Sequence, residues 1–113
     1  MIRVPIGISW YKGRTYAIKE SLNNSYCGYV KLVTEKELQN LMTEDHVDTY
    51  IDMHGGCTYR GSLEEMGDTG TWIGFDILHC FDGPDTQNFI YCLEECKRII
   101  EQLLKYNKEE IKE

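Results

Sequence analysis

The 113-residue chain has no long apolar run, only two prolines and no C-x-x-C motif. A membrane-spanning helix needs about 20 consecutive apolar residues, and no segment approaches that composition. The first residues carry one arginine but are interrupted by Pro5 and Gly7, so they do not resemble a signal peptide. We therefore expect a protein that has no membrane partner and stays in the cytoplasm.

The cysteines do not form a recognisable framework. Their number is odd, and their spacing fits neither a set of disulfides nor a zinc knuckle. Reduced thiols in a cytoplasm are the simpler interpretation, with two of them four residues apart as small buried side chains of a helix. The sequence thus leads us to expect no metal and no cofactor. The five residues are Cys27, Cys57, Cys80, Cys92 and Cys96.

Two nucleophile arrangements lack support. No G-x-S-x-G motif occurs, and Ser62 has no local group to activate it. Cys57 and Cys80 each lie within three residues of a histidine, but a thiol and an imidazole must touch to form a catalytic pair. Cysteine catalysis is therefore a weak hypothesis.

Positive charge is scarce and unevenly distributed. The net charge is −7, and residues 1–33 contain five lysines or arginines against one glutamate, so residues 34–113 carry −11. An acidic body repels the phosphate backbone of long nucleic acids. A basic N-terminal segment can still attract one compact anion, although these side chains are equally explained as solubilising residues on strands.

Hydrophobic residues are present at 42%, enough for one core in a chain of this length. Two runs rich in β-branched and aromatic residues, 6–11 and 14–19, flank Lys12-Gly13 and predict a hairpin. A third strand is predicted over 26–33, where Gly28 indicates a bulge or a close backbone approach.

Further along the chain, alternating polar and apolar residues predict a strand over 47–53. Residues 61–70 have the composition of an exposed loop. The segment 71–77, which contains Trp72 and Phe75, predicts another strand.

Two helices are predicted. Thr34 and Glu37 have the spacing of a capping box, followed by Leu38, Leu41 and Met42 at helical intervals. A long amphipathic helix starts at a cap on Asp85 or Thr86. Its exposed side is predicted to carry two i,i+4 ion pairs, Glu94 with Arg98 and Glu101 with Lys105. Its apolar stripe consists of Phe89, Cys92, Leu93, Cys96, Ile99, Ile100, Leu103 and Leu104.

These elements define an α+β fold, in which an antiparallel sheet packs against a long C-terminal amphipathic helix, with one short extra helix. Residues 1–113 form a single domain, because no linker or repeat divides them. The polar segment 107–113 is expected to fray.

Most of the unusual local chemistry lies in three segments, 52–61, 72–76 and 79–82. Gly55 and Gly56 can expose backbone N–H groups to an anion, or they can simply form a tight turn. Imidazole and carboxylate groups suit acid–base chemistry or ligand binding, and a structural role at strand ends is the alternative. The candidates are His54, Asp76, His79 and Asp82.

Aromatic side chains surround these segments. Tyr59, Trp72 and Phe75, with the earlier Trp10, Tyr11, Tyr26 and Tyr29, offer flat faces for a planar base, while Arg60 can neutralise a phosphate. Core packing is the alternative for Trp72 and Phe75. Eight tyrosines exceed what a core of this size can use, so some are expected to face a ligand or another subunit.

Three motifs in order resemble a group of small phage and prophage proteins. The family pattern runs C-G-Y-V, then H-G-G-x-T-Y-x-G, then W-x-G-F-D-x-x-H, and it corresponds here to 27–30, 54–61 and 72–79. The chain departs from it at Cys57 and at 77–78, and Asp82 lies one residue later than the family's acid. The resemblance implies a phage origin and a place in the cytoplasm of a bacterial host.

The resemblance also implies a class of function, because small phage proteins of this kind include inhibitors of bacterial defence. We expect a homo-oligomer that binds and sequesters a small anionic nucleotide signal, such as a cyclic nucleotide or an ADP-ribose derivative. The expected ligand-binding residues are His54, Gly55, Gly56, Thr58, Tyr59, Arg60, Trp72, Phe75, Asp76 and His79.

Two other functions stay open. One is a small hydrolase of phosphoester or glycosidic bonds, in which His54 and His79 act as acid and base or join Asp76 and Asp82 around a divalent metal. The other is an inhibitor that presents the acidic surface of residues 34–113 to a basic host protein.

Overall fold

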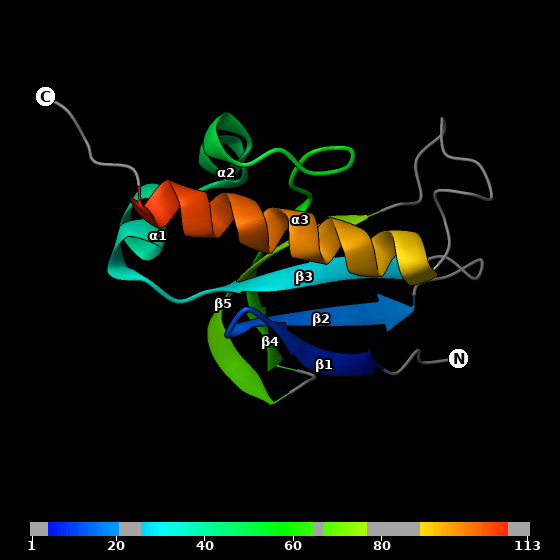
Figure 1. Cartoon of the computed structure of the whole chain (residues 1–113). Coiled ribbons are helices and arrows are strands. Elements are labelled where there is room, and N and C mark those ends of the chain that lie inside the picture. The colour runs from blue at the N-terminus through cyan, green and yellow to red at the C-terminus, as the bar shows by residue number, and fades with distance from the viewer. Residues whose placement is uncertain (1–4, 21–25, 65–66, 77–88, 109–113) are drawn as a thin grey trace, which may run out of the picture.

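The protein consists of a five-stranded antiparallel sheet and a long helix that covers one of its faces (Figure 1). The computed structural model describes residues 5–20, 26–64, 67–76 and 89–108. The elements are β1 (Pro5–Tyr11), β2 (Arg14–Glu20), β3 (Tyr26–Leu32), α1 (Glu35–Asn40), α2 (Glu44–Tyr50), β4 (Tyr59–Leu63), β5 (Asp68–Asp76) and α3 (Phe89–Lys108). The predicted α+β class is confirmed, with two short helices where one was predicted.

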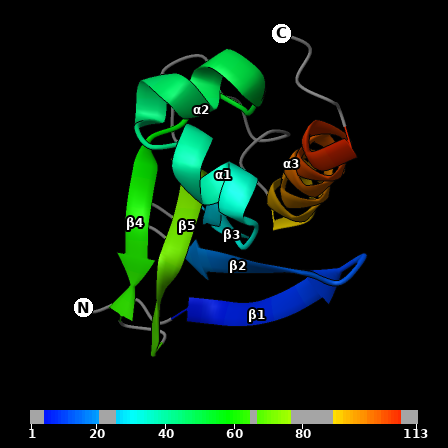
Figure 2. The ribbon, with the colours of Figure 1, turned by 90° about the vertical axis from the view of Figure 1, so that its left-hand side faces the viewer.

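The sheet has the strand order β1-β2-β3-β5-β4, so β1 and β4 are its edges. The predicted N-terminal hairpin is confirmed: Tyr11 pairs with Arg14 across a turn in which Lys12 and Gly13 have φ of 50° and 78°. Positive φ at both turn residues gives the twist that joins antiparallel strands tightly. Figure 2 shows that β4 and β5 turn away from the direction of β1 and β2, and that α3 lies on the concave side.

The central strand β3 explains Gly28. A Cβ atom at this position would lie 2.5 Å from the Phe75 ring and 2.7 Å from the Cys96 sulfur. The glycine therefore marks a close approach of β3 to its neighbours, and the register of β3 is regular on both sides. Register shifts occur instead at Pro5/Gly7 and at Gly61/Leu63.

The predicted strand over residues 47–53 is wrong, because residues 44–50 form helix α2. Thr43 caps this helix by accepting a hydrogen bond from the amide of His46, at 3.1 Å. Val47 and Ile51 are both buried, and their i,i+4 spacing suits one face of a helix as well as the alternation suits a strand. The cap at Thr43 favours the helix over the strand.

The expected loop over residues 61–70 is also wrong in part. Residues 59–63 form β4, and β5 begins at Asp68, earlier than the predicted Thr71. The segment contains Gly61, Gly67 and Gly70, so its composition is that of a turn. It forms strands because β4 and the first residues of β5 pair with each other.

Helix α1 has the predicted capping box, in which Thr34 and Glu37 bond each other's backbone. Of the apolar residues predicted for this helix, only Leu41, at its C-cap, is buried, whereas Leu38 and Met42 are exposed. The buried residue within α1 is Glu37, which the apolar pattern does not identify.

Helix α3 buries the predicted apolar stripe, including Cys92, Cys96 and Ile100, against the sheet. The proposed caps Asp85 and Thr86 lie outside the described residues. Asn107 does not fray: its side-chain amide donates to the carbonyl of Leu103 at 2.8 Å and to the carboxylate of Glu37. Among the helices that the structure describes, none combines the length and apolarity of a bilayer span.

The ion pairs on α3 differ from those predicted. Arg98 pairs with Glu95 and Asp52, and Glu101 pairs with Lys12 of the β1–β2 turn. Arg98 thus uses an i,i+3 neighbour and a tertiary partner, and Glu101 uses a tertiary partner, in place of the predicted i,i+4 neighbours.

The core has two parts, one on each face of the sheet. The larger part lies between the sheet and α3 and contains Ile73 and Phe75. The smaller part lies on the other face and contains Ala17, Leu63 and Trp72, partly covered by Tyr29 and Tyr59.

Candidate functional site

A polar face of α3 holds the extended segment that follows α2. Tyr91, Glu95, Arg98 and Gln102 are spaced by four, three and four residues, so they share one side of the helix. Each of them bonds a residue of the segment 52–54. We call these four residues and the segment 52–54 the polar ladder.

The C-terminal end of the polar ladder is formed by Gln102 and Arg98. The side-chain amide of Gln102 accepts from the Asp52 amide at 2.7 Å and donates to the Asp52 carbonyl at 2.6 Å. Arg98 donates to the Asp52 carboxylate at 3.0 Å. The backbone and the side chain of Asp52 are therefore both fixed to α3.

The N-terminal end is formed by His54. Its Nδ1 and the Tyr91 hydroxyl share a hydrogen bond of 2.9 Å, and the two rings meet edge to face with centroids 5.3 Å apart. Its backbone amide donates to the Glu95 carboxylate at 2.7 Å. The imidazole is thus held in one orientation by its ring and by its backbone.

Glu95 is the buried centre of the polar ladder. Its carboxylate accepts from Arg98 Nε at 2.8 Å and Nη2 at 2.7 Å, in the forked geometry that suits a guanidinium and a carboxylate. The bonds from Arg98 to Glu95, and then to Asp52, hold the pKa of Arg98 above its ordinary value against the opposing effect of burial. The guanidinium therefore stays charged and in place.

A hollow of about 360 Å³ lies beside the polar ladder. Pockets for small ligands start at roughly 300 Å³, so the volume suits a compact molecule. A tyrosine lines it from each of two elements, β1 and α3. The lining residues are Tyr11, Tyr91, Glu94, Glu95, Lys97, Arg98 and Glu101.

The glycine turn follows His54. Gly55 and Gly56 have φ of 70° and 84°, as a tight turn requires. The Gly56 amide donates to the Met53 carbonyl at 2.9 Å within the turn, and the next amide, of Cys57, donates to the Asp48 carboxylate of α2 at 2.7 Å. Two amides of this segment are therefore used inside the protein.

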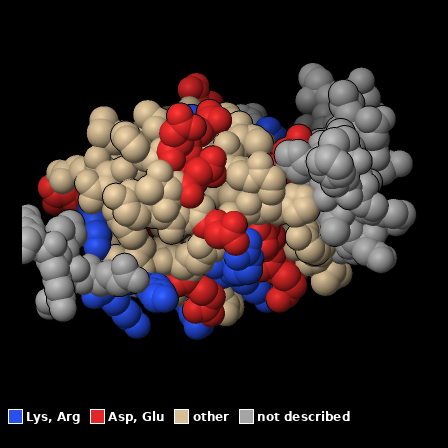
Figure 3. Space-filling view, turned by 90° about the horizontal axis from the view of Figure 1, so that it is seen from above, with Lys and Arg blue, Asp and Glu red and all other residues tan. Residues whose placement is uncertain are grey.

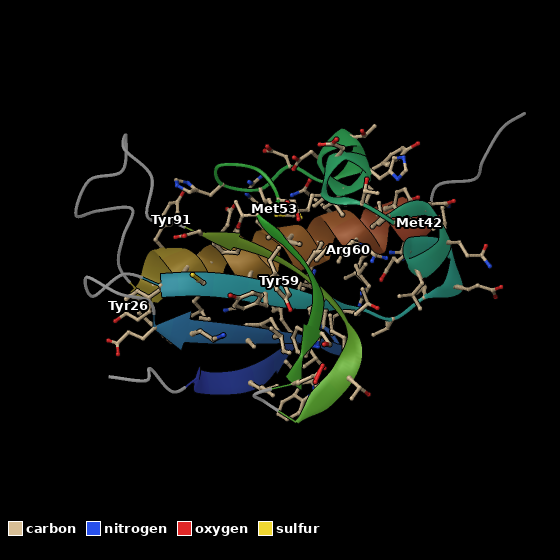
Figure 4. All side chains as sticks on the ribbon, turned by 180° about the vertical axis from the view of Figure 1, so that it is seen from behind. Tyr26, Met42, Met53, Tyr59, Arg60 and Tyr91 are labelled. Carbon is tan, nitrogen blue, oxygen red and sulfur yellow. The ribbon has the colours of Figure 1, made fainter. Side chains whose placement is uncertain are left out.

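Arg60 and Thr58 have partners outside the polar ladder. Arg60 donates from Nε to the carbonyl of Leu41 at 2.5 Å, and it ties β4 to the connection between α1 and α2. Figure 4 shows Tyr26 and Tyr91 at the end of the molecule where α3 begins and Arg60 toward Met42. Thr58 is exposed, with its amide bonded to the Gly74 carbonyl at 2.9 Å.

The three aromatic residues of the expected site do not share one hollow. Trp72 and Phe75 are 0% and 1% exposed and belong to the two cores on opposite faces of the sheet. Tyr59 packs edge to face against Tyr29, with centroids 5.4 Å apart, on the Trp72 side. Tyr11 and Tyr91 are the aromatic residues that line the hollow by the polar ladder instead.

Asp76 ends β5 and pairs in register with Cys27 of β3. Next to Cys27, Tyr26 packs on Phe89 with centroids 5.7 Å apart, so the end of β5 and the start of α3 belong to the same end of the molecule. His79, Cys80 and Asp82 lie outside the described residues.

The described residues bear on nucleophile and metal chemistry only in part, because His79, Cys80 and Asp82 are not among them. Burial raises the pKa of the Cys57 thiol above its ordinary value, and a thiol that stays protonated is a poor nucleophile. Within the parts of the chain that the structure describes, no three His, Cys, Asp or Glu side chains are placed to hold a metal ion.

The sequence interpretation missed Tyr91, Glu95, Arg98 and Gln102. No local signal identifies them, because polar residues at 4-3-4 spacing share one side of any helix, whether that side contacts water or another segment.

The chain matches no protein-family model, no curated protein and no solved structure.

Proposed function

We propose that the protein binds and sequesters a small nucleotide-like ligand in the hollow beside the polar ladder. The observation that carries the proposal is the bond between His54 and Tyr91, which fixes the Tyr91 ring where it lines a hollow of about 360 Å³. A binding group that is already immobilised loses little entropy when a ligand arrives.

The lining groups suit a nucleoside. Tyr11 and Tyr91 provide aromatic faces for a base, and the carboxylates Glu94 and Glu95 can accept from ribose hydroxyls or base N–H groups. Arg98, which is partly exposed and fixed by Glu95, provides a cation at the same hollow.

The charges favour a ligand with few phosphates. Glu94 pairs with Lys97, Glu95 with Arg98 and Glu101 with Lys12, so little free positive charge faces the hollow. Figure 3 shows acidic side chains gathered on the face seen from above. In α2, Glu44, Asp45 and Asp48 are all exposed. A cyclic nucleotide or a compact ADP-ribose derivative fits this balance better than a polyphosphate or a long nucleic acid.

The biological role that we propose follows from the resemblance to small phage proteins. A phage-encoded chain that captures a nucleotide immune signal would act as an inhibitor of bacterial defence in the host cytoplasm. Sequestration needs tight binding and release of an unchanged molecule.

The test is calorimetric titration of the purified protein with cyclic dinucleotides, cyclic ADP-ribose derivatives and AMP, followed by heating and mass spectrometry of the released ligand. We expect one of these compounds to bind and to be recovered intact. His54→Ala and Arg98→Gln should each weaken binding at least about tenfold, which corresponds to about 1.4 kcal/mol.

His46→Ala is the matched control, because His46 is an exposed histidine of α2 and should leave affinity unchanged. If no compound binds, or if His46→Ala weakens binding as much as His54→Ala, the proposal fails.

A hydrolase is the second candidate, since a histidine and a tyrosine in contact can exchange a proton. It predicts that the recovered nucleotide is cleaved and that His54→Ala abolishes turnover while the fold survives. Recovery of intact ligand after long incubation with divalent metals rules it out.

A further inference from the structure

Among residues 5–20, 26–64, 67–76 and 89–108, no strand pairs with the outer edge of β1, and this edge is apolar. Ile8 and Trp10 are 38% and 68% exposed, although most large apolar side chains of the sheet are buried. The strand Pro5–Tyr11 contains no charged residue. Edge strands of monomers are commonly protected by charges, bulges or short length, because an open edge can pair with another strand.

The backbone of β1 has hydrogen-bonding groups that its own hairpin does not use. Tyr11 and Arg14 flank a two-residue turn, so they form a hydrogen-bonded pair, as does Ser9 with Tyr16. Ile8 and Trp10 alternate with these positions. Their N–H and C=O groups therefore point away from β2, toward the open edge.

The opposite edge is different. Strand β4 has five residues and a register shift within its paired stretch, between Gly61 and Leu63, whereas the shift of β1 lies at Pro5/Gly7, before Ile8 and Trp10. The carbonyl of Ser62 accepts a hydrogen bond from the Tyr59 hydroxyl, and Arg60 extends toward the carbonyl of Leu41. This edge is blunted by its own side chains, so β1 is the better template for an added strand.

An apolar hollow of about 260 Å³ adjoins the β1 edge on the α3 side. It exists because Gly7 and Ser9, the β1 residues that face α3, are too small to fill the space over Tyr16 and Ile18. Apolar surface beside an open edge favours an occupant that extends the sheet. The remaining lining comes from Ile8, Phe89 and Leu93.

We infer that β1 pairs antiparallel with β1 of a second copy of this chain, with the two-fold axis near Ser9. In this register Ile8 of one copy lies opposite Trp10 of the other, and the outward groups of both residues become partners. An aromatic residue opposite a β-branched residue is a favourable cross-strand pair.

Charge supports a second copy as the occupant. A two-fold contact places identical residues near each other, so a charged strand would repel itself, and β1 carries no charge. The nearest cation after it, Lys12, is paired with Glu101 at 2.7 Å. Tyr11 belongs both to β1 and to the lining of the hollow beside the polar ladder, but pairing of β1 uses the backbone at Ile8 and Trp10, so the inference does not rest on the proposed ligand.

The test uses sedimentation velocity of the full chain over a series of protein concentrations. Ile8→Pro removes an N–H that faces the open edge, so the β1–β2 ladder stays intact. We expect the parent protein to form dimers and Ile8→Pro to raise the dimer dissociation constant at least about tenfold. Trp10→Glu should do the same by placing two carboxylates at the contact.

Met42→Glu is the matched control, because Met42 is similarly exposed, at 59%, and lies after α1. It should leave the dimer unchanged. Hydrogen exchange gives a second readout: the amides of Ile8 and Trp10 should be protected in the parent and exchange rapidly in Trp10→Glu. A parent that stays monomeric, or a dimer that survives both edge variants, overturns the inference.

Discussion

Arg14 and Glu37 form a buried ion pair in which two guanidinium nitrogens meet two carboxylate oxygens, at 2.7 and 3.0 Å. Glu37 is 0% exposed, and it also accepts from the Val33 amide at 2.9 Å and from Asn107 at 2.5 Å. The pair therefore joins β2, the start of α1 and the end of α3. A carboxylate can be buried when its lone pairs are used in this way.

Removing one partner of this pair should cost much more stability than removing both. Arg14→Met leaves a buried carboxylate without its cation, and we expect a loss of about 3–5 kcal/mol in the free energy of unfolding. Arg14→Met with Glu37→Met should recover part of this loss. Urea unfolding measures both, with Lys12→Met as the exposed control, for which little change is expected because Lys12 and Glu101 are in solvent. A double variant that is the least stable of the set would contradict this account.

The same pair predicts a pH dependence. Burial favours the neutral acid, but the bonds from Arg14, Asn107 and Val33 outweigh it and lower the pKa of Glu37 below its ordinary value. The stabilisation is therefore fully present above the ordinary glutamate pKa, about 4.3, and is lost as pH falls through the folded pKa.

We expect the stability difference between the parent and Glu37→Gln to shrink as the pH is lowered from 7 to 3, measured by urea unfolding at each pH. Other acids such as Asp68 are present in both proteins and cancel in the difference. A difference that is constant with pH would show that Glu37 does not titrate with the fold.

How far the sequence predicts this molecule depends on where the deciding interactions lie. The β1–β2 turn, the capping box of α1 and the apolar stripe of α3 are local signals, and each was predicted. Strand β4 was missed because its partner is β5, beyond a glycine turn, and α2 was mistaken for a strand because Val47 and Ile51 suit both periods.

The candidate site was predicted in part. His54 lies at the site, but its partners Tyr91, Glu95 and Arg98 come from α3, some forty residues later in the chain. The sequence does not tell which polar residues of an amphipathic helix meet another segment and which meet water. Trp72 was predicted as a ligand contact for a related reason, since nothing local shows that a second small core lies on that face.

Gly28 should not tolerate even a methyl group. An added Cβ would lie 2.5 Å from the Phe75 ring and 2.7 Å from Cys96 Sγ, both in the packed core. Gly28→Ala is expected to cost about 1–3 kcal/mol through overpacking. Gly7→Ala is the control, because no atom lies within 4 Å of its added Cβ. Thermal unfolding of both variants at equal concentration decides the point, and equal melting temperatures would contradict it.

The polar ladder should control the site from a distance. Gln102 holds the backbone of Asp52 by two hydrogen bonds, of 2.6 and 2.7 Å, but does not line the hollow beside His54. Gln102→Ala should cost about 0.5–1.5 kcal/mol of stability. It should also accelerate hydrogen exchange at Asp52, whose amide loses its acceptor.

If the ladder positions His54, Gln102→Ala should weaken ligand binding several-fold without changing any residue that contacts the ligand. Gln39→Ala is the matched control, because Gln39 is an exposed residue of α1 whose side-chain amide donates to Glu35 of the same helix at 2.9 Å. Faster exchange at Asp52 with unchanged affinity would mean that the orientation of His54 is set by Tyr91 and Glu95 alone. Slow exchange at Asp52 in Gln102→Ala would show that the ladder does not hold this segment.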